Sequence, residues 1–336
     1  AALELHPTNK KAGVFAPIGG FRAVGNSFRR LAESFGVEIR FQTTVTQVSN
    51  EGVMIKGENG GESSFVPADL VVVNADLPFA TKSLISKSSG EDNKNHASEI
   101  DAIRETFDWD DQFDFSSGVV AFHWAVNKPL DDLNTHNVFM SAGSRSEAEQ
   151  SWSILRDANN KDVTGDTPFN FYVHRASKTD PSAAPEGCDS IMVLVPCKHL
   201  SRQAEFSRLP REEAILKYKA QFDDDFICSM KKDVLKRLSV LKGLGNLESD
   251  IIHEVIDTPG TYADYYNVGA GVPFGLSHGF GQLSLTRPPA QSKELENVLY
   301  VGASSRPGNG VPLVLIGAKL VAEKAIRKLS NRDQSD

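Results

Sequence analysis

The chain has 336 residues, 40% of them hydrophobic and 24% charged, which is the composition of an ordinary globular protein long enough for about two domains. The net charge of −8 disfavours nucleic acid as the main partner, because a phosphate-binding surface is normally basic. The three cysteines are widely spaced and fit neither a disulfide framework nor a zinc site. We therefore expect a reducing compartment and cysteines with structural roles.

The sequence shows no membrane span and no targeting signal. Its apolar runs stay below the roughly 18 residues that a spanning helix needs. The start, Ala1 to Pro7, lacks an initiator Met, a basic segment and an apolar segment. From this start we expect that the chain begins inside a longer protein.

The first predicted helix lies near the N-terminus. Apolar residues from Val24 to Phe35 recur at helical spacing, which predicts a helix of about four turns that ends at Gly36. Residues 37–41 then alternate between apolar and polar side chains, as in a strand. Shorter strands are expected at residues 45–48, 52–55 and 63–66, with a hairpin-like turn at 57–61.

Residues 70–73 form a continuous apolar run, which is typical of a central strand buried on both faces. The run ends at residues 74–76, and the Leu77-Pro78 that follows can start a helix. Asn and Asp at such a strand end are most simply helix caps or turn formers.

Polar residues 86–101 predict a surface loop and a domain edge. Four aromatic residues follow among acidic ones: Phe107, Trp109, Phe113 and Phe115. They could line an apolar substrate channel, although aromatic rows of this kind are more often part of a core.

Three strands are predicted without helices between them, at residues 119–126, 168–174 and 190–196, which indicates an antiparallel sheet. Such a sheet can form the floor of a ligand cavity. A polar insertion at 141–166 separates the first two strands and has weak helical character at 147–155.

The longest helical pattern covers residues 210–241, and its acidic patch at 223–225 suggests a solvated face. A strand is expected at 251–256, followed by a loop over 258–267. The glycine-dense stretch 269–282 that comes next contains no GxGxxG, and neither does the rest of the chain, so the usual dinucleotide fingerprint is missing.

Near the C-terminus, residues 298–301 predict a buried strand, 303–312 a rigid loop of small residues and prolines, and Leu313 the start of a helix. The free N–H groups of that helix would point into the loop, where they suit an electron-rich group. By spacing alone, a cofactor site and an ordinary strand–turn–helix corner are equally good interpretations.

The stretch from Tyr300 to Pro312, followed by Gly317-Ala-Lys, resembles the flavin-contacting motif near the C-terminus of bacterial and fungal-type phytoene desaturases. Segments 17–45, 68–78, 115–139 and 275–288 are also similar to that family, in the same order. The cofactor-binding residues that the resemblance implies are Val45, Asn74, Ala75, Asp76, Gly302, Ala303, Pro307, Gly308, Asn309, Gly310, Val311 and Pro312. Phe274, Leu276 and His278 are expected near the substrate end; a catalytic base at His278 is a weaker hypothesis than a structural histidine.

The resemblance implies an α/β plus α+β fold. A partial, Rossmann-like FAD-binding domain would comprise residues 1–100 and 286–336, with an inserted substrate domain of antiparallel sheet and helices at 101–285. The implied cofactor is FAD, and the implied reaction is desaturation of a polyene such as phytoene, in which a hydride leaves an allylic carbon for the flavin. We expect no nucleic-acid partner and an upstream FAD-binding segment that this chain lacks.

Neither a catalytic residue nor a metal site can be assembled from the sequence. Because the implied substrate lives in a bilayer, we expect an intracellular protein with peripheral membrane contact, with the organelle left open. The alternatives are a catalytically inactive fragment, a flavin amine oxidase-like enzyme with a more polar pocket, and a non-enzymatic prenyl-protein escort on the same fold.

Overall fold

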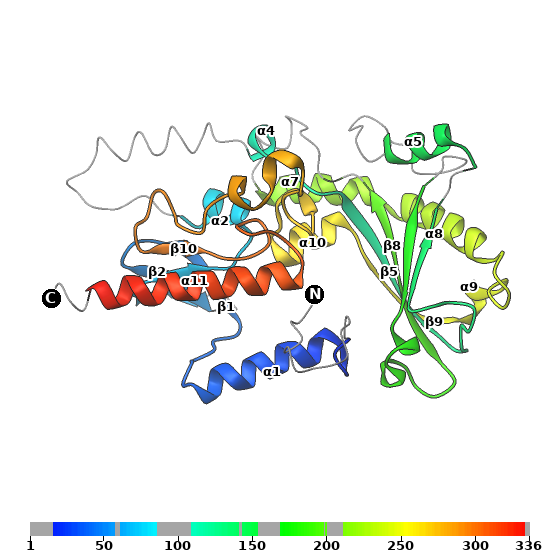
Figure 1. Cartoon of the computed structure of the whole chain (residues 1–336), viewed down its shortest axis with the longest axis horizontal. Helices are drawn as coiled ribbons and strands as arrows, with labels where there is room; N and C mark the ends of the chain where they lie inside the picture. The colour runs from blue at the N-terminus through cyan, green and yellow to red at the C-terminus, as the bar shows by residue number, and fades with distance from the viewer. Residues whose placement is uncertain are drawn as a thin grey trace.

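The computed structural model describes residues 16–57, 61–85, 109–140, 143–153, 169–197, 199 and 211–332. The predicted surface loop at 86–101, Phe107, most of the turn at 57–61 and much of the insertion at 141–166 lie outside these residues. The fold is a mixed α/β fold whose elements form two groups along the long axis of the molecule (Figure 1).

Among the described residues, the first group contains two small sheets and four helices. They are α1 (Gly20–Ser34), β1 (Thr43–Val48), β2 (Gly52–Gly57), β3 (Ser63–Pro67), β4 (Val71–Val73), α2 (Leu77–Ser83), α4 (Trp109–Gln112), β10 (Val298–Tyr300) and α11 (Val311–Arg332). Strands β1, β2 and β3 form an antiparallel sheet, as the predicted hairpin requires. Strands β4 and β10 pair in parallel, with Val72 opposite Leu299.

The second group is built on a five-stranded antiparallel sheet in the order β6-β7-β8-β5-β9. Its elements are β5 (Gly118–Val126), β6 (His136–Phe139), α5 (Arg145–Ser153), β7 (Phe171–Arg175), β8 (Asp189–Cys197), α7 (Arg211–Lys219), α8 (Asp224–Leu238), α9 (Leu247–Asp250), β9 (Ile251–Asp257) and α10 (Pro259–Tyr266). This sheet confirms the prediction of antiparallel strands. Side chains along β7 and β8 alternate between buried and half-buried, so one face of the sheet packs against a core.

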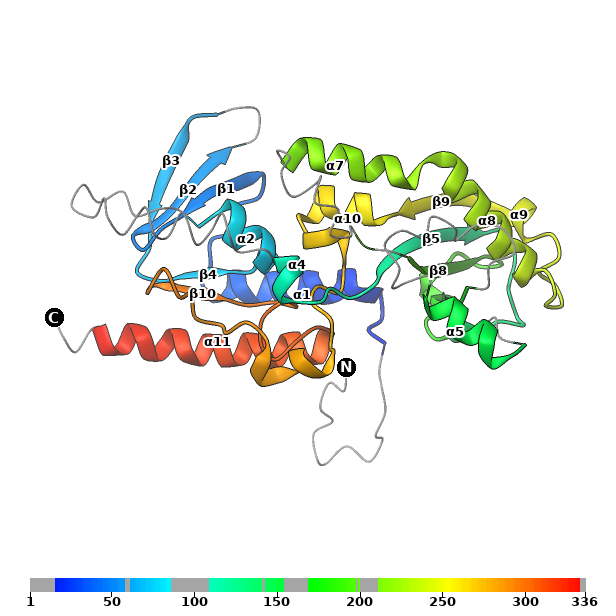
Figure 2. The ribbon, with the colours of Figure 1, turned by 90° about the horizontal axis from the view of Figure 1, so that it is seen from above.

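That core lies between the sheet and α8, which runs along one side of β5, β8 and β9 (Figure 2). Met230, Val234 and Leu238 of α8 are fully buried there, because they recur every four residues on one helix face. The opposite face of the sheet is only partly covered: Tyr172, His174, Met192 and Leu194 are half-buried.

The elements of the first group pack around a second core, which also contains residues from the predicted substrate domain at 101–285. Trp109, Phe115, Val272 and Leu276 are buried in it together with Val73 and Val298. The aromatic residues of the predicted row that the structure describes therefore serve as core. The domain division at residues 100 and 285 stays a prediction.

Two segments predicted as strands, 37–41 and 70–73, differ in the structure from the prediction. Residues 37–41 form no regular strand, because Gly36 (φ +80°) turns the chain after α1 and the strand that pairs with β2 begins only at Thr43. The run at 70–73 does form β4, but Val72 is 45% exposed, so the expected burial on both faces is wrong for the described residues. Helix α1 forms as predicted, although none of its residues is buried.

Two helix predictions are also corrected. The pattern at 210–241 is two helices, α7 and α8, because the Asp223 carboxylate accepts a hydrogen bond from the Phe226 N–H (2.8 Å) and begins a new helix there. The predicted loop at 258–267 contains α10, which a capping box between Thr258 and Thr261 and a proline at its first position begin. In the described residues, no helix is long and apolar enough to cross a membrane.

The three cysteines differ in exposure, and this predicts their reactivity. Cys197 on β8 is buried, which raises the pKa of its thiol, whereas Cys228 on α8 is exposed and Cys188 is intermediate. A structural role thus fits Cys197 better than Cys228. Because thiolate formation and access control the reaction, we expect Ellman's reagent to modify Cys228 at least about a hundredfold faster than Cys197 in the native protein.

Mass spectrometry of the labelled peptides measures this difference, and Cys228→Ser serves as the control that should remove the fast phase. Equal labelling of Cys197 and Cys228 under native conditions would show that β8 is not packed as described.

Candidate functional site

The ends of β4 and β10 bring together two segments that lie far apart in the sequence. Because these strands are parallel, their carboxyl ends meet at one edge, and ligands of α/β sheets bind beyond that edge. Residues 74–76 follow β4 and residues 301–310 follow β10. The Val301 N–H donates to the Val73 carbonyl (3.0 Å), which fixes the two segments side by side. The predicted cofactor residues at 74–76 thus lie beside Gly302 and Ser304 at the start of the predicted 302–312 segment.

The segment between β10 and α11, residues 301–310, is called the C-terminal loop below. Gly302 (φ +123°) and Gly308 (φ +142°) both have backbone angles that other residues rarely adopt. A Cβ atom on Gly308 would lie 2.4 Å from Nε2 of His278, so the histidine ring packs directly on this glycine. Helix α11 begins at Val311, two residues earlier than predicted.

The substrate residues predicted from the sequence lie on the segment that packs against this loop. Residues 274–282 are called the substrate loop; they include Phe274, Leu276 and His278. Asn309 donates from Nδ2 to the Phe274 carbonyl (2.6 Å), which joins the two loops. Phe274 is 43% exposed, whereas Leu276 is fully buried in the core and reaches no surface in the described structure. Desolvation and the charge of Arg287 lower the pKa of His278, which favours the neutral form of its ring.

Asp76 connects three segments. It stands at the N-terminal cap position of α2, as the sequence suggested, but its carboxylate accepts hydrogen bonds from the Gly269 N–H (2.7 Å) and from Oγ of Ser304 (2.7 Å). Desolvation raises the pKa of Asp76, and these donors partly offset the effect. In the structure its side chain therefore fixes the C-terminal loop; a direct contact with a cofactor stays a prediction.

Arg287 also holds this site, and the sequence pattern did not reveal its role. Its side chain is 1% exposed. Nη1 donates to the carbonyls of Ser277 (2.7 Å) and Gln282 (3.3 Å), and Nη2 to those of Leu276 (3.1 Å) and Ala303 (2.7 Å). One signal was present: residues 265–286 contain no Asp, Glu, Lys or Arg, so Arg287 is an isolated charge next to an apolar stretch.

Val45 lies elsewhere in the first group. It pairs with Ile55 in the three-stranded sheet and packs against the second core. Its pairing and packing thus place it with β2 rather than with the C-terminal loop. Its predicted contact with an adenine ring stays a prediction.

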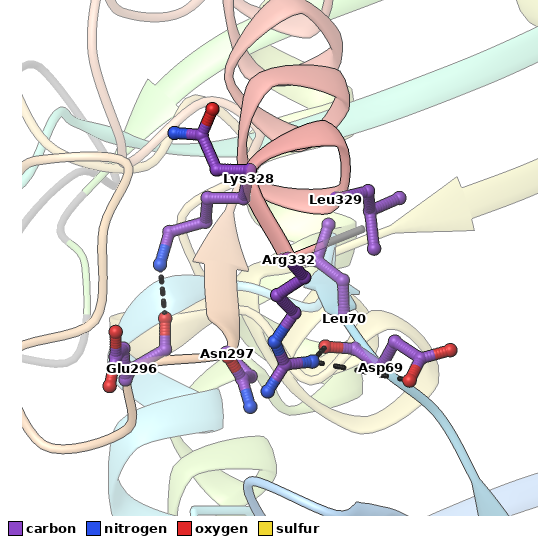
Figure 3. Close-up of a pocket in the computed structure, with 8 residues that line it drawn as sticks. Asp69, Leu70, Glu296, Asn297, Lys328, Leu329 and Arg332 are labelled. Atoms are coloured by element: carbon purple, nitrogen blue, oxygen red, sulfur yellow. Dashed lines mark hydrogen bonds and ion pairs between the residues drawn. The ribbon is translucent and has the colours of Figure 1, made fainter. Parts of the chain in front are cut away.

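A pocket of about 220 Å³ lies at the opposite end of β4 and β10 (Figure 3). Lys328 donates to the Glu296 carbonyl (2.8 Å) and Arg332 to the Asp69 carbonyl (2.8 Å) across it. These residues precede the two strands or belong to the last turns of α11. Ligands of parallel sheets bind beyond the carboxyl ends of the strands, and this pocket lies at the other end.

The chain matches known proteins over nearly its whole length, although no family model matches it. It is 32% identical over 329 residues to a phytoene desaturase of Fusarium fujikuroi, with 96% of this chain and 53% of that protein covered. It is 30% identical over 327 residues to a phytoene desaturase of Neurospora crassa, and the match covers 94% of this chain and 49% of that protein. A zeta-carotene-forming phytoene desaturase of Myxococcus xanthus is 28% identical over 318 residues, and the match covers 94% of this chain and 53% of that protein.

The chain is therefore similar to carotenoid desaturases over about 95% of its length, and it spans about half the length of the curated relatives it matches. Among solved structures, an oxidoreductase from Methanosarcina mazei has a TM-score of 0.51 and 17% identity, with 91% of this chain and 55% of that chain covered. At this identity the similarity shows the fold alone.

Proposed function

We propose that this chain forms part of an FAD-dependent desaturase that acts on an apolar carotenoid precursor such as phytoene. The observation that carries the proposal is that the C-terminal loop, which resembles a flavin-contacting motif, packs on the substrate loop through Gly308, His278 and Asn309. The similarity to carotenoid desaturases supports the same reaction and substrate class.

The residues at the carboxyl ends of β4 and β10 fit a flavin. Gly302 and Gly308 let the backbone approach a flat ring closely, and hydrogen bonds from Ser304 to Asp76 and from buried Arg287 to the Ala303 carbonyl hold the loop. In this proposal residues 302–312 and 74–76 would hold the flavin and the pyrophosphate of FAD, and Val45 would contact the adenine.

When bound, FAD supplies the acceptor for a hydride from an allylic carbon. The chain's own residues orient the substrate and keep water out. The His278 ring packs on Gly308, and the Phe274 carbonyl accepts a hydrogen bond from Asn309, so both residues lie beside the C-terminal loop, where they would limit how a polyene enters. The half-buried face of the five-stranded sheet, with Tyr172, Met192 and Leu194, would form the floor for the rest of the polyene.

Exposed apolar surfaces on β4, α1 and α11 suggest that another segment packs against them. Parallel sheets are normally covered on both faces, yet Val72 of β4 is 45% exposed and α1 buries no residue. The exposed apolar residues of α1 and α11 include Phe21, Phe28, Leu31, Ile316 and Leu320. In this proposal an upstream βαβ segment with the glycine-rich FAD fingerprint covers these faces and completes the cofactor site.

A polyene substrate also requires access to a bilayer. Phe280 (97% exposed) on the substrate loop and Leu285 (79% exposed) just after it belong to a stretch without Asp, Glu, Lys or Arg. They are the residues that we propose for peripheral membrane contact.

The experiment that tests the function is a visible absorption spectrum of the purified chain after incubation with FAD and gel filtration, with and without an upstream βαβ segment added as a second polypeptide. We expect flavin bands that stay with the protein, most strongly with the added segment, and anaerobic bleaching of these bands by phytoene. Bleaching by a primary amine instead would indicate an amine oxidase-like enzyme. Retained flavin that neither compound bleaches, or no retained flavin in either preparation, would contradict the proposed activity and indicate an inactive fragment.

A further inference from the structure

Arg287 is a buried cation without a carboxylate partner in the described part of the chain. Its four hydrogen-bond acceptors are backbone carbonyls, and no described Asp or Glu oxygen lies within the 4.0 Å that defines an ion pair. Its Nε atom is buried and has no hydrogen-bond partner among the residues that the structure describes. Buried charges are normally paired, because a low-dielectric interior penalises an isolated charge.

The carbonyls satisfy hydrogen bonds but do not cancel the charge. Arg175 in the second group shows the usual solution, since its guanidinium lies 2.8 Å from the buried Asp189 carboxylate. Among the described residues, one net positive charge therefore remains at Arg287, one hydrogen bond away from Ala303 near the start of the C-terminal loop. The same guanidinium contacts Leu276, Ser277 and Gln282, so it also fixes the distance between the substrate loop and the C-terminal loop.

The proposed reaction adds negative charge at this place. If FAD is bound here, the hydride that leaves the allylic carbon would carry the two electrons of its C–H bond to the flavin, which would then hold one more negative charge. The neighbouring carbon releases one proton to solvent as the C=C bond forms, so atoms and charge balance.

We propose that Arg287 is a positioning residue with an electrostatic role: it holds the two loops together, and its uncompensated charge favours reduced over oxidised flavin at the C-terminal loop. This inference rests on the proposed function, because it requires a flavin at that loop. It adds a residue that sets how readily the bound flavin accepts a hydride.

The test compares dissociation constants of oxidised FAD and of dithionite-reduced FAD for the chain supplied with the upstream segment. Arg287→Met and Arg287→Gln remove the charge, and Arg287→Gln keeps a hydrogen-bond donor. Arg287→Lys keeps the charge but loses the planar fork. Arg237→Met is the matched control, because Arg237 is a half-buried cation on α8 that donates to the Phe169 carbonyl, in the other group of elements.

We expect the neutral variants to weaken binding of reduced FAD relative to oxidised FAD at least tenfold, which equals a midpoint potential lower by about 30 mV for a two-electron couple. In Arg287→Lys, the ratio of the dissociation constants of reduced and oxidised FAD should stay within about threefold of the wild-type ratio. Arg237→Met should leave this ratio unchanged. A ratio in Arg287→Gln or Arg287→Met equal to that of the wild type would overturn the proposal. If neither neutral variant folds, the wild type alone decides. The proposal is then overturned if the wild type binds reduced FAD more weakly than oxidised FAD.

A flavin-free measurement separates this proposal from the proposed function. The Ser277 N–H donates to the Asp114 carbonyl (2.8 Å) and the Gln282 N–H to the Gly279 carbonyl (2.8 Å). If Arg287 holds the substrate loop, hydrogen exchange at both amides should be at least tenfold faster in Arg287→Lys, while Arg237→Met leaves it unchanged. Unchanged exchange would contradict the positioning role even if flavin binds; a wild type that binds neither form of FAD contradicts the proposed function and the electrostatic role.

Discussion

Replacing Asp189 with asparagine should lower the free energy of unfolding by about 3–5 kcal/mol, because it leaves a buried guanidinium without its main counter-charge. Asp189 begins β8 and is 2% exposed. Its carboxylate contacts Nη2 of Arg175 (2.8 Å), accepts from the Leu130 N–H (2.6 Å) and accepts from the Ser177 hydroxyl. One substitution therefore disturbs the strand, the turn before it and the chain near Leu130.

Urea unfolding followed by circular dichroism measures the effect. The second carboxylate near Arg175, Asp131, is 85% exposed and lies 3.5 Å away, so solvent screens it and it cannot replace Asp189. The control is Glu149→Gln, which removes the exposed pair between Glu149 and Arg145 (2.9 Å) and should cost less than about 0.5 kcal/mol. A loss below about 1 kcal/mol in Asp189→Asn would show that Arg175 finds another partner or that water reaches it.

Replacing Gly308 with alanine should separate the C-terminal loop from the substrate loop. The added Cβ would lie 2.4 Å from Nε2 of His278, and the φ of +142° strains any residue with a side chain. Overpacking and backbone strain together predict a loss of about 2–4 kcal/mol in stability. If a flavin binds here, its retention through gel filtration should fall at least tenfold.

Thermal unfolding and flavin retention are measured together for Gly308→Ala. Gly281→Ala is the matched control on the substrate loop, because a Cβ atom added there would meet no atom of a described residue beyond its chain neighbours within 4 Å, and Gly281 is not among the glycines with positive φ. The double variant Gly308→Ala/His278→Ala should recover part of the loss, since it removes the ring that the Cβ meets. No recovery in the double variant would assign the whole effect to the backbone of Gly308 and remove His278 from the contact between the loops.

Local patterns were sufficient for the elements on which the site depends. The apolar runs at 70–73 and 298–301 predicted β4 and β10, because a short buried strand between turn residues is a property of the local sequence. The loop after β10 and α11 followed from the prolines, glycines and helical spacing in the same way. Local patterns failed where one side-chain cap decided the outcome, as at Asp223 and Thr258, which begin helices inside a predicted helix and a predicted loop.

The sequence by itself determined that the chain has an antiparallel sheet, a strand–loop–helix near its C-terminus and a resemblance to phytoene desaturases, because strand periodicity and motif order are properties of the linear chain. Only the tertiary structure decided that Asp76 and Arg287 hold neighbouring residues of the C-terminal loop, and that Leu276 belongs to the core. The physical reason is that these contacts join residues far apart in sequence. They form only after β4 and β10 have paired. The hydrogen-bond partners of a buried charged side chain are then the backbone groups that the fold brings next to it.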